Sequence, residues 1–592
     1  MTELQNQTTI NIQEKSALIW GIADLIRDYY KPHEYGKVIL PFCVLKRFND
    51  VLIPTKDKVL ETYEKVKHLE VIDGFLERAS GYSFYNTSNY DFQKLTQDPT
   101  HIEENFKDYI NGFSENIQEI LENYDFDNEI RKLANGDLLF LVVEAFNKPW
   151  AYMGADKISS VDMGYIFEDL IKRFSESYDE QAGAHFTSRD IIYLMTDLLI
   201  SEEKEMMIEE GVAKTVYDMT MGTSQMLTCM TERLKELDAD ADVRTFGQEL
   251  NPETYAIAKS SALIHGQNAS NMKKGNTLSE DQFHNYKFDY IISNPPFGID
   301  YKREKTAIEK EHELGDAGRF CTKLPKISDG QMLFDLNGIA KLKDDGRMAI
   351  IHNGSSLFTG AAESGESEIR RYMIENDWLD TIVQLSNDVF YNTGITTYIW
   401  LISKNKPLHR QGKVQLIDAS QMVVSRRKSL GNKRNDITTK DREIIVKAYG
   451  EFKNATYTLD GKVCESKIFN NEDFGYNRIQ IETPTYDENG NIITKGKQNK
   501  PVADTSKRDY ENVPLVEDID SYFNREVKPY NSDAWIEKNK TKVGYEIPFT
   551  RYFYKYQAPE KSEVIEERLK ELELNISESL ESLFGMEGAY NV

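Results

Sequence analysis

Apolar side chains divide the chain into a helical first part and an alternating second part. They recur at helical spacing from Leu18 to Tyr29, and a second apolar run extends from Val38 to Phe48. This part of the sequence carries neither a glycine-rich loop nor a cluster of catalytic residue types. The pattern predicts an N-terminal helical domain over residues 1–155, which serves either for docking or as a scaffold.

Short apolar segments alternate with helical ones from residue 156 to residue 480. This alternation predicts an α/β domain with a Rossmann-like sheet of about seven or more strands. The predicted strands are Val216–Asp218, Arg244–Glu249, Tyr290–Ile292, Gly346–His352, Leu379–Leu385, Thr396–Ser403 and Val414–Asp418. The predicted helices include Gln225–Leu237, Gln331–Leu342 and Ser367–Glu375.

The last part of the chain, residues 481–592, has a different pattern. Asn, Gly, Lys and Thr are frequent from Thr483 to Asp509, which predicts a linker or an extended hairpin. A final helix follows, and its apolar residues recur at steps of four and three, with Ser579 in one slot. Such spacing is typical of a short coiled-coil seam, and equally of a helix that faces a core. The seam residues are Ile565, Leu569, Leu572, Ile576 and Leu583.

The composition is that of an ordinary globular protein. The length of 592 residues suits about three or four domains. The apolar fraction of 40% is that of a soluble globular protein. The apolar runs are far shorter than the ~18 residues that span a membrane, and the polar first residues lack a signal-peptide core. Four widely spaced cysteines indicate a reducing compartment and no structural zinc. We therefore expect a cytoplasmic protein without a metal site or a membrane anchor.

The segment Asn294-Pro-Pro-Phe297 is the strongest candidate for chemistry. It follows the predicted strand Tyr290–Ile292, and two successive prolines cannot continue a central strand because they lack amide donors. The Asn294 side-chain oxygen and the Pro295 carbonyl are thus presented at the carboxyl end of a strand, where open α/β sheets bind ligands. The alternative is a proline-rich turn with no chemical role.

Two acceptors aimed at one point suit a planar exocyclic amine such as adenine N6. The lone pair of this amine is delocalised into the ring, so the nitrogen is a poor nucleophile. Acceptors that bind both hydrogens favour a pyramidal nitrogen whose lone pair is free for attack. Phe297 offers a flat face on which a base can stack once it leaves the duplex.

Three earlier strand ends carry polar loops. Asp218 precedes the tight turn Gly222-Thr-Ser224 and a helix, Glu249 ends the next strand, and Asn276 lies in the loop after that. A strand, a glycine turn and a helix form the dinucleotide type of loop, and a carboxylate after the second strand commonly accepts ribose hydroxyls. In this order the loops predict a nucleoside-like cofactor with a polar tail. Taken singly, they are caps and turn residues.

Two further segments flank these loops. Ala182–Asp190 precedes an apolar helix, and Thr187 or Ser188 is a candidate N-cap that would expose amide donors to a carboxylate. Tyr301–Ser328 directly follows the Asn294 segment and is rich in Lys, Arg and Glu. It is a candidate lid or substrate-contact loop, or equally a solvated insertion.

Together these segments resemble the DNA-methylating (modification) subunit of type I restriction-modification systems, which are adenine-N6 methyltransferases. The resemblance runs through most of the chain and includes the order of the motifs. It is carried by Tyr35-Gly-Lys-Val38, Phe186-Thr-Ser188, the Asp218 loop, Gly247-Gln-Glu249, Gly275-Asn-Thr-Leu278, Asn294-Pro-Pro-Phe297, Phe390-Tyr-Asn-Thr-Gly-Ile395, Phe474-Gly-Tyr476 and Asp533-Ala-Trp535.

The resemblance implies methyl transfer from S-adenosylmethionine to adenine N6 in DNA, without a metal. The catalytic residues that it implies are Asn294, Pro295, Pro296 and Phe297. The cofactor-binding residues that it implies are Ala184, His185, Phe186, Thr187, Ser188, Arg189, Asp218, Gly222, Thr223, Ser224, Glu249, Asn276 and Asn294.

The resemblance also implies partners. Double-stranded DNA is the substrate, a separate specificity subunit selects the sequence, a restriction subunit joins for cleavage, and two copies of this chain are present per complex. The net charge of −26, from 72 basic and 98 acidic residues, agrees with a grip on DNA that comes from a partner or from local basic patches. Residues 481–592 would then be a linker and a partner-binding helical region.

Four positions depart from the residues that are usual in this family. They are Ser188, Met219, Ser224 and Asn276. The last two favour one alternative, a non-catalytic assembly subunit that binds the cofactor poorly. A second alternative is a methyltransferase that acts on a protein glutamine or on RNA, since an Asn-Pro-Pro corner also suits other planar amides and amines.

Overall fold

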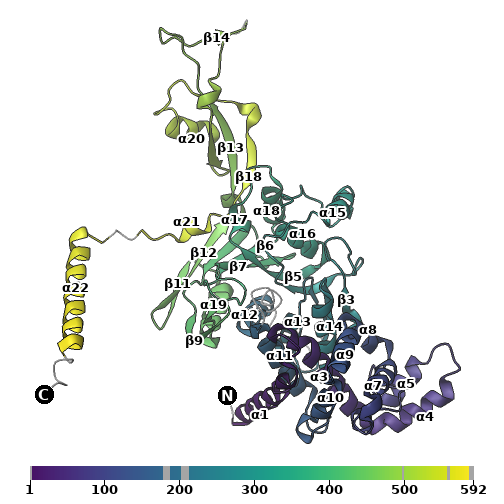
Figure 1. Ribbon diagram of the computed structural model, residues 1–592. Helices are drawn as coiled ribbons and strands as arrows, with labels where there is room; N and C mark the ends of the chain where they lie inside the picture. The colour runs from purple at the N-terminus through teal and green to yellow at the C-terminus, as the bar shows by residue number, and fades with distance from the viewer. Residues whose placement is uncertain (1–2, 178–186, 202–212, 497–498, 557–559, 586–592) are drawn as a thin grey trace. The chain divides into compact units, whose positions relative to one another are not determined.

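The computed structural model describes residues 3–177, 187–201, 213–496, 499–556 and 560–585. The chain forms two compact units, Met1–Ile547 and Pro548–Val592. The larger unit contains N-terminal helices, a ten-stranded sheet and a small antiparallel sheet (Figure 1). Among the helices of the described residues, none has the length and apolar character needed to cross a bilayer.

The N-terminal part is helical, as predicted. The run Val38–Phe48 is the middle of one helix, and the apolar residues of the run are all buried. The run Leu18–Tyr29 is divided at Gly21, because glycine has a low helix propensity. One helix ends before Gly21 and a short helix begins after it. The helices are α1 (Glu3–Trp20), α2 (Ala23–Ile26), α3 (Tyr35–Leu52), α4 (Lys56–Val66), α5 (Asp73–Ser80), α6 (Phe92–Leu95), α7 (Ile102–Asn111), α8 (Glu115–Asn123), α9 (Phe126–Asn135), α10 (Leu139–Phe146) and α11 (Ser160–Ser177).

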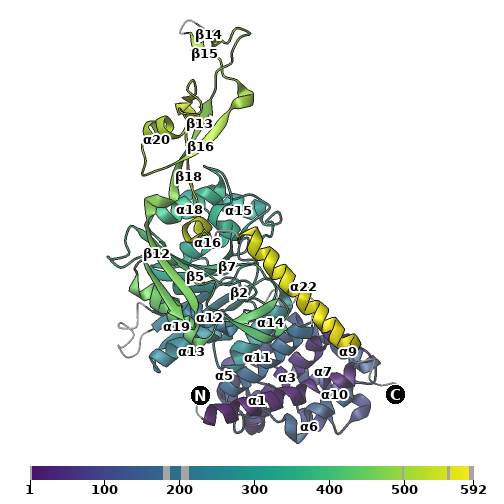
Figure 2. The same cartoon turned by 90° about the vertical axis from the view of Figure 1, so that its left-hand side faces the viewer.

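The main sheet confirms the predicted α/β fold. Its ten strands lie in the order β11-β12-β8-β6-β7-β5-β4-β1-β2-β3, and helices separate several of them along the chain. Figure 2 shows helices on both sides of strands β2, β5 and β7. The strands are β1 (Ala213–Asp218), β2 (Asp242–Glu249), β3 (Met272–Lys274), β4 (Phe288–Ser293), β5 (Leu342–Asn353), β6 (Leu379–Gln384), β7 (Thr397–Ser403), β8 (Lys413–Asp418), β11 (Ala455–Leu459) and β12 (Lys462–Asn470). The helices are α12 (Arg189–Ile200), α13 (Gln225–Leu237), α14 (Pro252–Ile264), α15 (Lys305–His312), α16 (Gln331–Lys341), α17 (Ser355–Phe358), α18 (Gly365–Glu375) and α19 (Thr439–Glu451).

The centre of the sheet is parallel, so its polar strand ends meet at one edge. β1 pairs in parallel with β2 and with β4, and β4 pairs in parallel with β5. Tyr290, Ile291 and Ile292 of β4 are completely buried, as expected for a strand that helices cover on both faces. Asp218, Glu249 and Asn294 therefore stand at or just beyond the carboxyl ends of neighbouring strands.

Polar contacts join the N-terminal helices to the main sheet through α14. Glu119 of α8 forms an ion pair with Lys259 of α14 and accepts a hydrogen bond from the Tyr255 hydroxyl at 2.7 Å. Both partners of Glu119 belong to the helix that follows β2, so the N-terminal part is fixed to the layer that supports the Glu249 strand.

A small antiparallel sheet follows the main sheet and was not predicted. β13 (Gly475–Glu482) pairs with β16 (Asp509–Pro514), β17 (Trp535–Ile536) and β18 (Lys542–Tyr545), and α20 (Ile519–Glu526) packs on it. β14 (Thr494–Lys495) and β15 (Lys500–Pro501) form a hairpin inside the segment expected to be a linker or hairpin. Arg370 of α18 donates to the Tyr545 carbonyl at 2.7 Å and so ties the small sheet to the main one.

The second unit contains the predicted C-terminal helix. It consists of α21 (Phe549–Phe553) and the long helix α22 (Ser562–Gly585). The apolar residues of its repeating pattern that the structure describes are all exposed, namely Ile565, Leu569, Leu572 and Ile576.

Candidate active site

A cavity of about 530 Å³ lies at the carboxyl edge of the main sheet. Its walls come from the loops after β1, β2, β3 and β4, from Ile299 to Glu304, and from the beginning of α16. Its volume suits a small-molecule cofactor. The predicted site residues that line it are Thr187, Asp218, Gly222, Thr223, Glu249, Asn276, Asn294 and Pro296.

The loop after β1 is held by a buried carboxylate. Asp218 accepts hydrogen bonds from the Ser293 hydroxyl at 2.7 Å and from the Thr220 amide at 3.0 Å, both at Oδ1. Burial raises the pKa of the Asp218 carboxyl to about 7, and the charge of Glu249 contributes to this shift. Ser293 is the last residue of β4, so Asp218 also links the β1 loop to the strand that carries Asn294.

The carboxylate of Glu249 organises the glycine turn. Its Oε2 accepts from the Gly222 amide at 3.0 Å, and its Oε1 accepts from the Asn251 amide at 2.8 Å. Gly222 has a φ of 52°, a left-handed conformation that glycine adopts without strain. Each carboxylate oxygen keeps acceptor capacity beyond its single amide bond. Glu249 thus presents a fixed negative acceptor beside a backbone that a ligand can approach closely.

The Asn294 corner is oriented by a contact from Thr187, which lies just before α12. The Asn294 Nδ2 donates to the Thr187 hydroxyl oxygen at 3.0 Å, which fixes the side-chain amide in one orientation. The nitrogen is thereby engaged, and Oδ1 is the group that can accept from a ligand. Pro295 is buried, Pro296 is exposed, and Phe297 is half-buried against the core.

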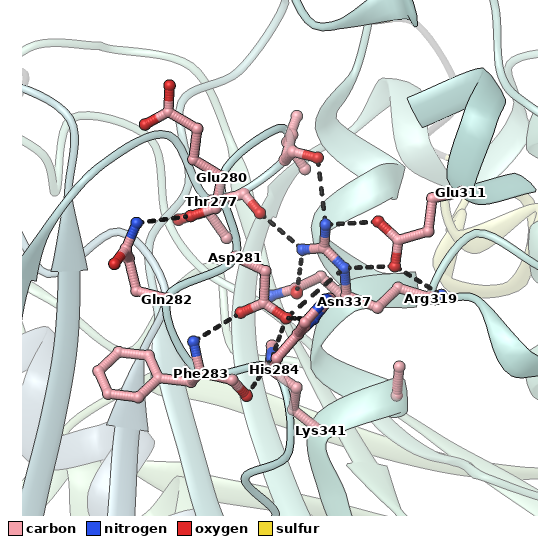
Figure 3. Close-up of polar contacts among 12 residues, drawn as sticks. Thr277, Glu280, Asp281, Gln282, Phe283, His284, Glu311, Arg319, Asn337 and Lys341 are labelled. Carbon is pink, nitrogen blue, oxygen red and sulfur yellow. Dashed lines mark hydrogen bonds and ion pairs between the residues drawn. The ribbon is translucent and has the colours of Figure 1, made fainter. Parts of the chain in front are cut away.

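The loop after β3 receives support from the segment that follows the corner. The Asn276 Nδ2 donates to Glu304 Oε1 at 2.8 Å. Asn276 itself carries no carboxylate, and Glu304 supplies one at this wall of the cavity. Arg319 is buried and donates to the Thr277 carbonyl at 2.6 Å (Figure 3). It also donates to the Leu278 carbonyl at 3.2 Å. Glu311 balances its charge at 2.6 Å. Part of Tyr301–Ser328 is therefore a structured wall of the cavity.

Five predicted residues lie beside the cavity without lining it. They are Ser188, Arg189, Ser224, Pro295 and Phe297. Arg189 forms ion pairs with Glu168 at 2.6 Å and Glu232 at 3.0 Å, a network between α11, α12 and α13. Ser224 is buried at the start of α13 with a φ of 63°, a position that suits glycine. Ala184, His185 and Phe186 lie outside the described residues.

Several lining residues were not predicted individually, although Tyr301 and Glu304 belong to the candidate lid segment Tyr301–Ser328. The motifs pointed to strand ends, whereas Ile299, Tyr301, Glu304 and Phe334 reach the cavity from the segment after the corner and from α16. Thr220 could have been predicted from the sequence, because it lies two residues after Asp218 inside the predicted loop. Its hydroxyl lies 2.8 Å from the Ser293 hydroxyl.

Comparisons with known proteins agree on one family. Residues 159–486 match the N-6 DNA Methylase family, and residues 16–146 match the HsdM N-terminal domain. The methylase subunit of the type I restriction enzyme MjaIX from Methanocaldococcus jannaschii is 23% identical over 512 residues, which cover 81% of this chain and 82% of that protein. The HindI methylase subunit from Haemophilus influenzae is 24% identical over 414 residues, covering 68% and 82% respectively.

A solved structure has the same fold. The methyltransferase subunit of a type I restriction-modification system from Streptococcus thermophilus superposes with a TM-score of 0.62 at 23% identity. The match covers 78% of this chain and 97% of that one.

Proposed function

The chain belongs to the N-6 DNA methylase family and is the DNA-methylating subunit of a type I restriction-modification system, and we propose that the cavity beside Asn294 binds S-adenosylmethionine. When bound, this cofactor supplies a methyl group on a positively charged sulfur. The residues present fit it, because two acidic strand ends and a glycine turn line a cavity of about 530 Å³.

The chain's own side chains divide the work of holding the cofactor. Glu249 accepts the ribose hydroxyls through the acceptor capacity that the Gly222 and Asn251 amides leave. Asn276, with Glu304 behind it, lies near the adenine ring. Asp218 keeps the loop after β1 against β4, so the Gly222 turn stays open to a ligand.

The Asn294 corner receives the target base. The Asn294 oxygen and the Pro295 carbonyl accept the two N6 hydrogens of an adenine that has left the duplex, and Phe297 stacks on its ring. One observation carries this proposal: Asn294, Asp218 and Glu249 line a single cavity, so an amine acceptor and cofactor-type carboxylates share one space. Thr187 supports it by orienting the Asn294 amide.

The partners follow from the class of enzyme. A specificity subunit selects the DNA sequence, a restriction subunit joins for cleavage, and two copies of this chain serve one complex in the cytoplasm. The exposed apolar residues of α22 provide a seam for a helix of such a partner.

Methyl transfer from labelled S-adenosylmethionine tests the function. The chain is incubated with duplex DNA, alone and with its specificity subunit, and the products are digested to nucleosides. The proposal predicts label in N6-methyladenine only when the specificity subunit is present. Label in protein or RNA would contradict it. A complex that binds DNA but neither binds the cofactor nor transfers methyl would be an assembly subunit.

A further inference from the structure

The hairpin of β9 (Val424–Leu430) and β10 (Lys433–Asp436) is basic in an acidic protein. Residues 424–435 contain no Asp or Glu, whereas the whole chain has a net charge of −26. The basic residues of the hairpin are Arg426, Arg427, Lys428, Lys433 and Arg434. Positive charge is therefore concentrated here against the average of the molecule.

Two of these cations are used within the fold. One guanidinium nitrogen of Arg426 donates to both carboxylate oxygens of Asp436, at 2.6 Å and 2.7 Å. Lys433 is buried and donates to Asp190 at 2.9 Å and to the Val389 carbonyl at 3.0 Å. These pairs hold the base of the hairpin.

The other three cations face solvent. Arg427, Lys428 and Arg434 are exposed, and their side chains form no hydrogen bond or ion pair with any other described residue. Asp436 and Asp190, the acids that contact the hairpin, form ion pairs with Arg426 and Lys433. Three positive charges are thus available to an external anion.

The hairpin stands at the edge of the sheet that carries the catalytic corner. It follows β8, which is parallel to β6. β6 and β5 are both antiparallel to β7 and therefore run in the same direction, and β4 is parallel to β5. The carboxyl ends of β8 and β4 thus lie at the same edge of the sheet. Asp190, which binds Lys433 and also accepts from the Ile437 amide at 2.9 Å, lies three residues after Thr187. Thr187 is the residue that orients Asn294.

The hairpin is docked on the loop after β6. The amides of Arg434 and Asn435 donate to the Asp388 carbonyl at 2.8 Å and 3.0 Å, and the Asn432 amide donates to the Tyr391 carbonyl at 2.9 Å. Gly431 has a φ of 55°, and a Cβ there would lie 2.6 Å from the Tyr391 oxygen. This close approach fixes the cations relative to the corner.

We propose that this hairpin binds the DNA sugar–phosphate backbone beside the target adenine, through Arg427, Lys428 and Arg434. The inference rests on the proposed function, since an adenine that reaches Asn294 brings its flanking phosphates to this edge of the sheet. Guanidinium and ammonium groups bind phosphate oxygens through charge-assisted hydrogen bonds and position the nucleic acid without reading its sequence.

The test measures DNA affinity of the complete complex with its specificity subunit at several salt concentrations. The hairpin variant is Arg427→Gln, Lys428→Gln, Arg434→Gln. The slope of log affinity against log salt is negative, and each lost phosphate contact reduces its magnitude by about 0.9. The magnitude should therefore decrease by about 2–3, and the affinity should drop about tenfold or more. S-adenosylmethionine affinity stays unchanged, because these residues lie outside the cofactor cavity.

Two further variants serve as controls. Lys235→Gln, Arg244→Gln, Lys287→Gln removes the same charge from exposed residues toward the opposite end of the sheet, and DNA binding should be unchanged. Arg427→Lys, Lys428→Arg, Arg434→Lys retains the charge and should retain most of the affinity.

Three outcomes overturn the inference. The first is a wild-type complex that methylates DNA while the hairpin variant keeps its slope and affinity. The second is an equal loss in the opposite-end control. The third is a hairpin variant that fails to assemble with the specificity subunit on gel filtration, which would make the hairpin a protein-binding surface. A wild-type complex that transfers no methyl to DNA would instead overturn the proposed function, and the inference with it.

Discussion

The Asn294 amide nitrogen lies 3.0 Å from the Thr187 hydroxyl oxygen, although 107 positions separate the two residues. Thr187 precedes α12, whereas Asn294 follows β4, so two different elements of the fold meet at the Asn294 amide. This contact decides which end of the amide faces the cavity. Activity should therefore depend on Thr187 even though its hydroxyl performs no chemistry.

Removing the Thr187 hydroxyl should slow methyl transfer. Thr187→Val keeps the side-chain shape but loses a hydrogen bond worth about 1 kcal/mol, so kcat should fall about 3–10-fold. Thr187→Ser retains the hydroxyl and is the matched control. Steady-state kinetics in which the Val variant equals wild type would show that Asn294 is oriented by other contacts.

Glu249 should control cofactor affinity. In Glu249→Gln one oxygen becomes an NH₂ group that faces a backbone amide, and the negative charge is lost. Hydrogen bonds to charged groups are worth about 1.5–3 kcal/mol, so S-adenosylmethionine should bind about 10–100-fold more weakly in calorimetry. Asp240→Asn changes the same charge at an exposed site and should bind normally. If Glu249→Gln bound S-adenosylmethionine as tightly as wild type, Glu249 would not bind the ribose of the cofactor.

Asp218 should make the stability of the cofactor-free protein depend on pH. Burial raises the pKa of its carboxyl to about 7, whereas an unfolded Asp has a pKa of about 3.9. Between these values the native state keeps a proton that the unfolded chain releases, so this group's contribution to the free energy of unfolding declines as pH rises from about 4 to 7.

Asp218→Asn removes this dependence while retaining an oxygen for the Ser293 hydroxyl and the Thr220 amide. Thermal unfolding at pH 5 and pH 8 provides the measurement. The midpoint of the variant relative to wild type should be higher at pH 8 than at pH 5. An equal difference at both pH values would mean that Asp218 is ionised throughout.

The backbone of Ser224 should be strained, and replacement by glycine should relieve this strain. Its φ of 63° is a left-handed conformation that costs a non-glycine residue about 1–2 kcal/mol, and its buried hydroxyl has no hydrogen-bond partner among the described residues. Ser224→Gly should stabilise the protein by up to about 1 kcal/mol in urea unfolding. Ser188→Gly, at a φ of −70°, should bring no gain. A destabilised Ser224→Gly would contradict the strain argument.

The features that could be predicted from the sequence are local. The buried strand β4 and the corner after it appear as an apolar run that ends in two prolines. Asp218 and Glu249 appear as acids at the ends of predicted strands. Strand direction then brings these ends to one edge, because parallel strands share their carboxyl ends.

The features that could not be predicted arise from contacts between distant segments. Glu304 reaches Asn276 across 28 positions, and Arg319 holds the Thr277 carbonyl from 42 positions away, with no spacing rule to indicate either. The small sheet was missed for the same reason. Gly475 of β13 pairs with Tyr545 of β18, 70 positions further along the chain, and β18 is only four residues long.

The central claim is that Asn294 makes the adenine amine reactive inside the complex with the specificity subunit. The most direct measurement is single-turnover methyl transfer by wild type, Asn294→Ala and Asn294→Asp, with S-adenosylmethionine binding measured in parallel. The Ala variant should lose about 10²–10³ in rate, because a preorganised acceptor is removed, while the Asp variant, which keeps acceptor oxygens, should lie between. Cofactor affinity should change far less than rate. An Ala variant that methylates adenine N6 as fast as wild type would contradict the claim.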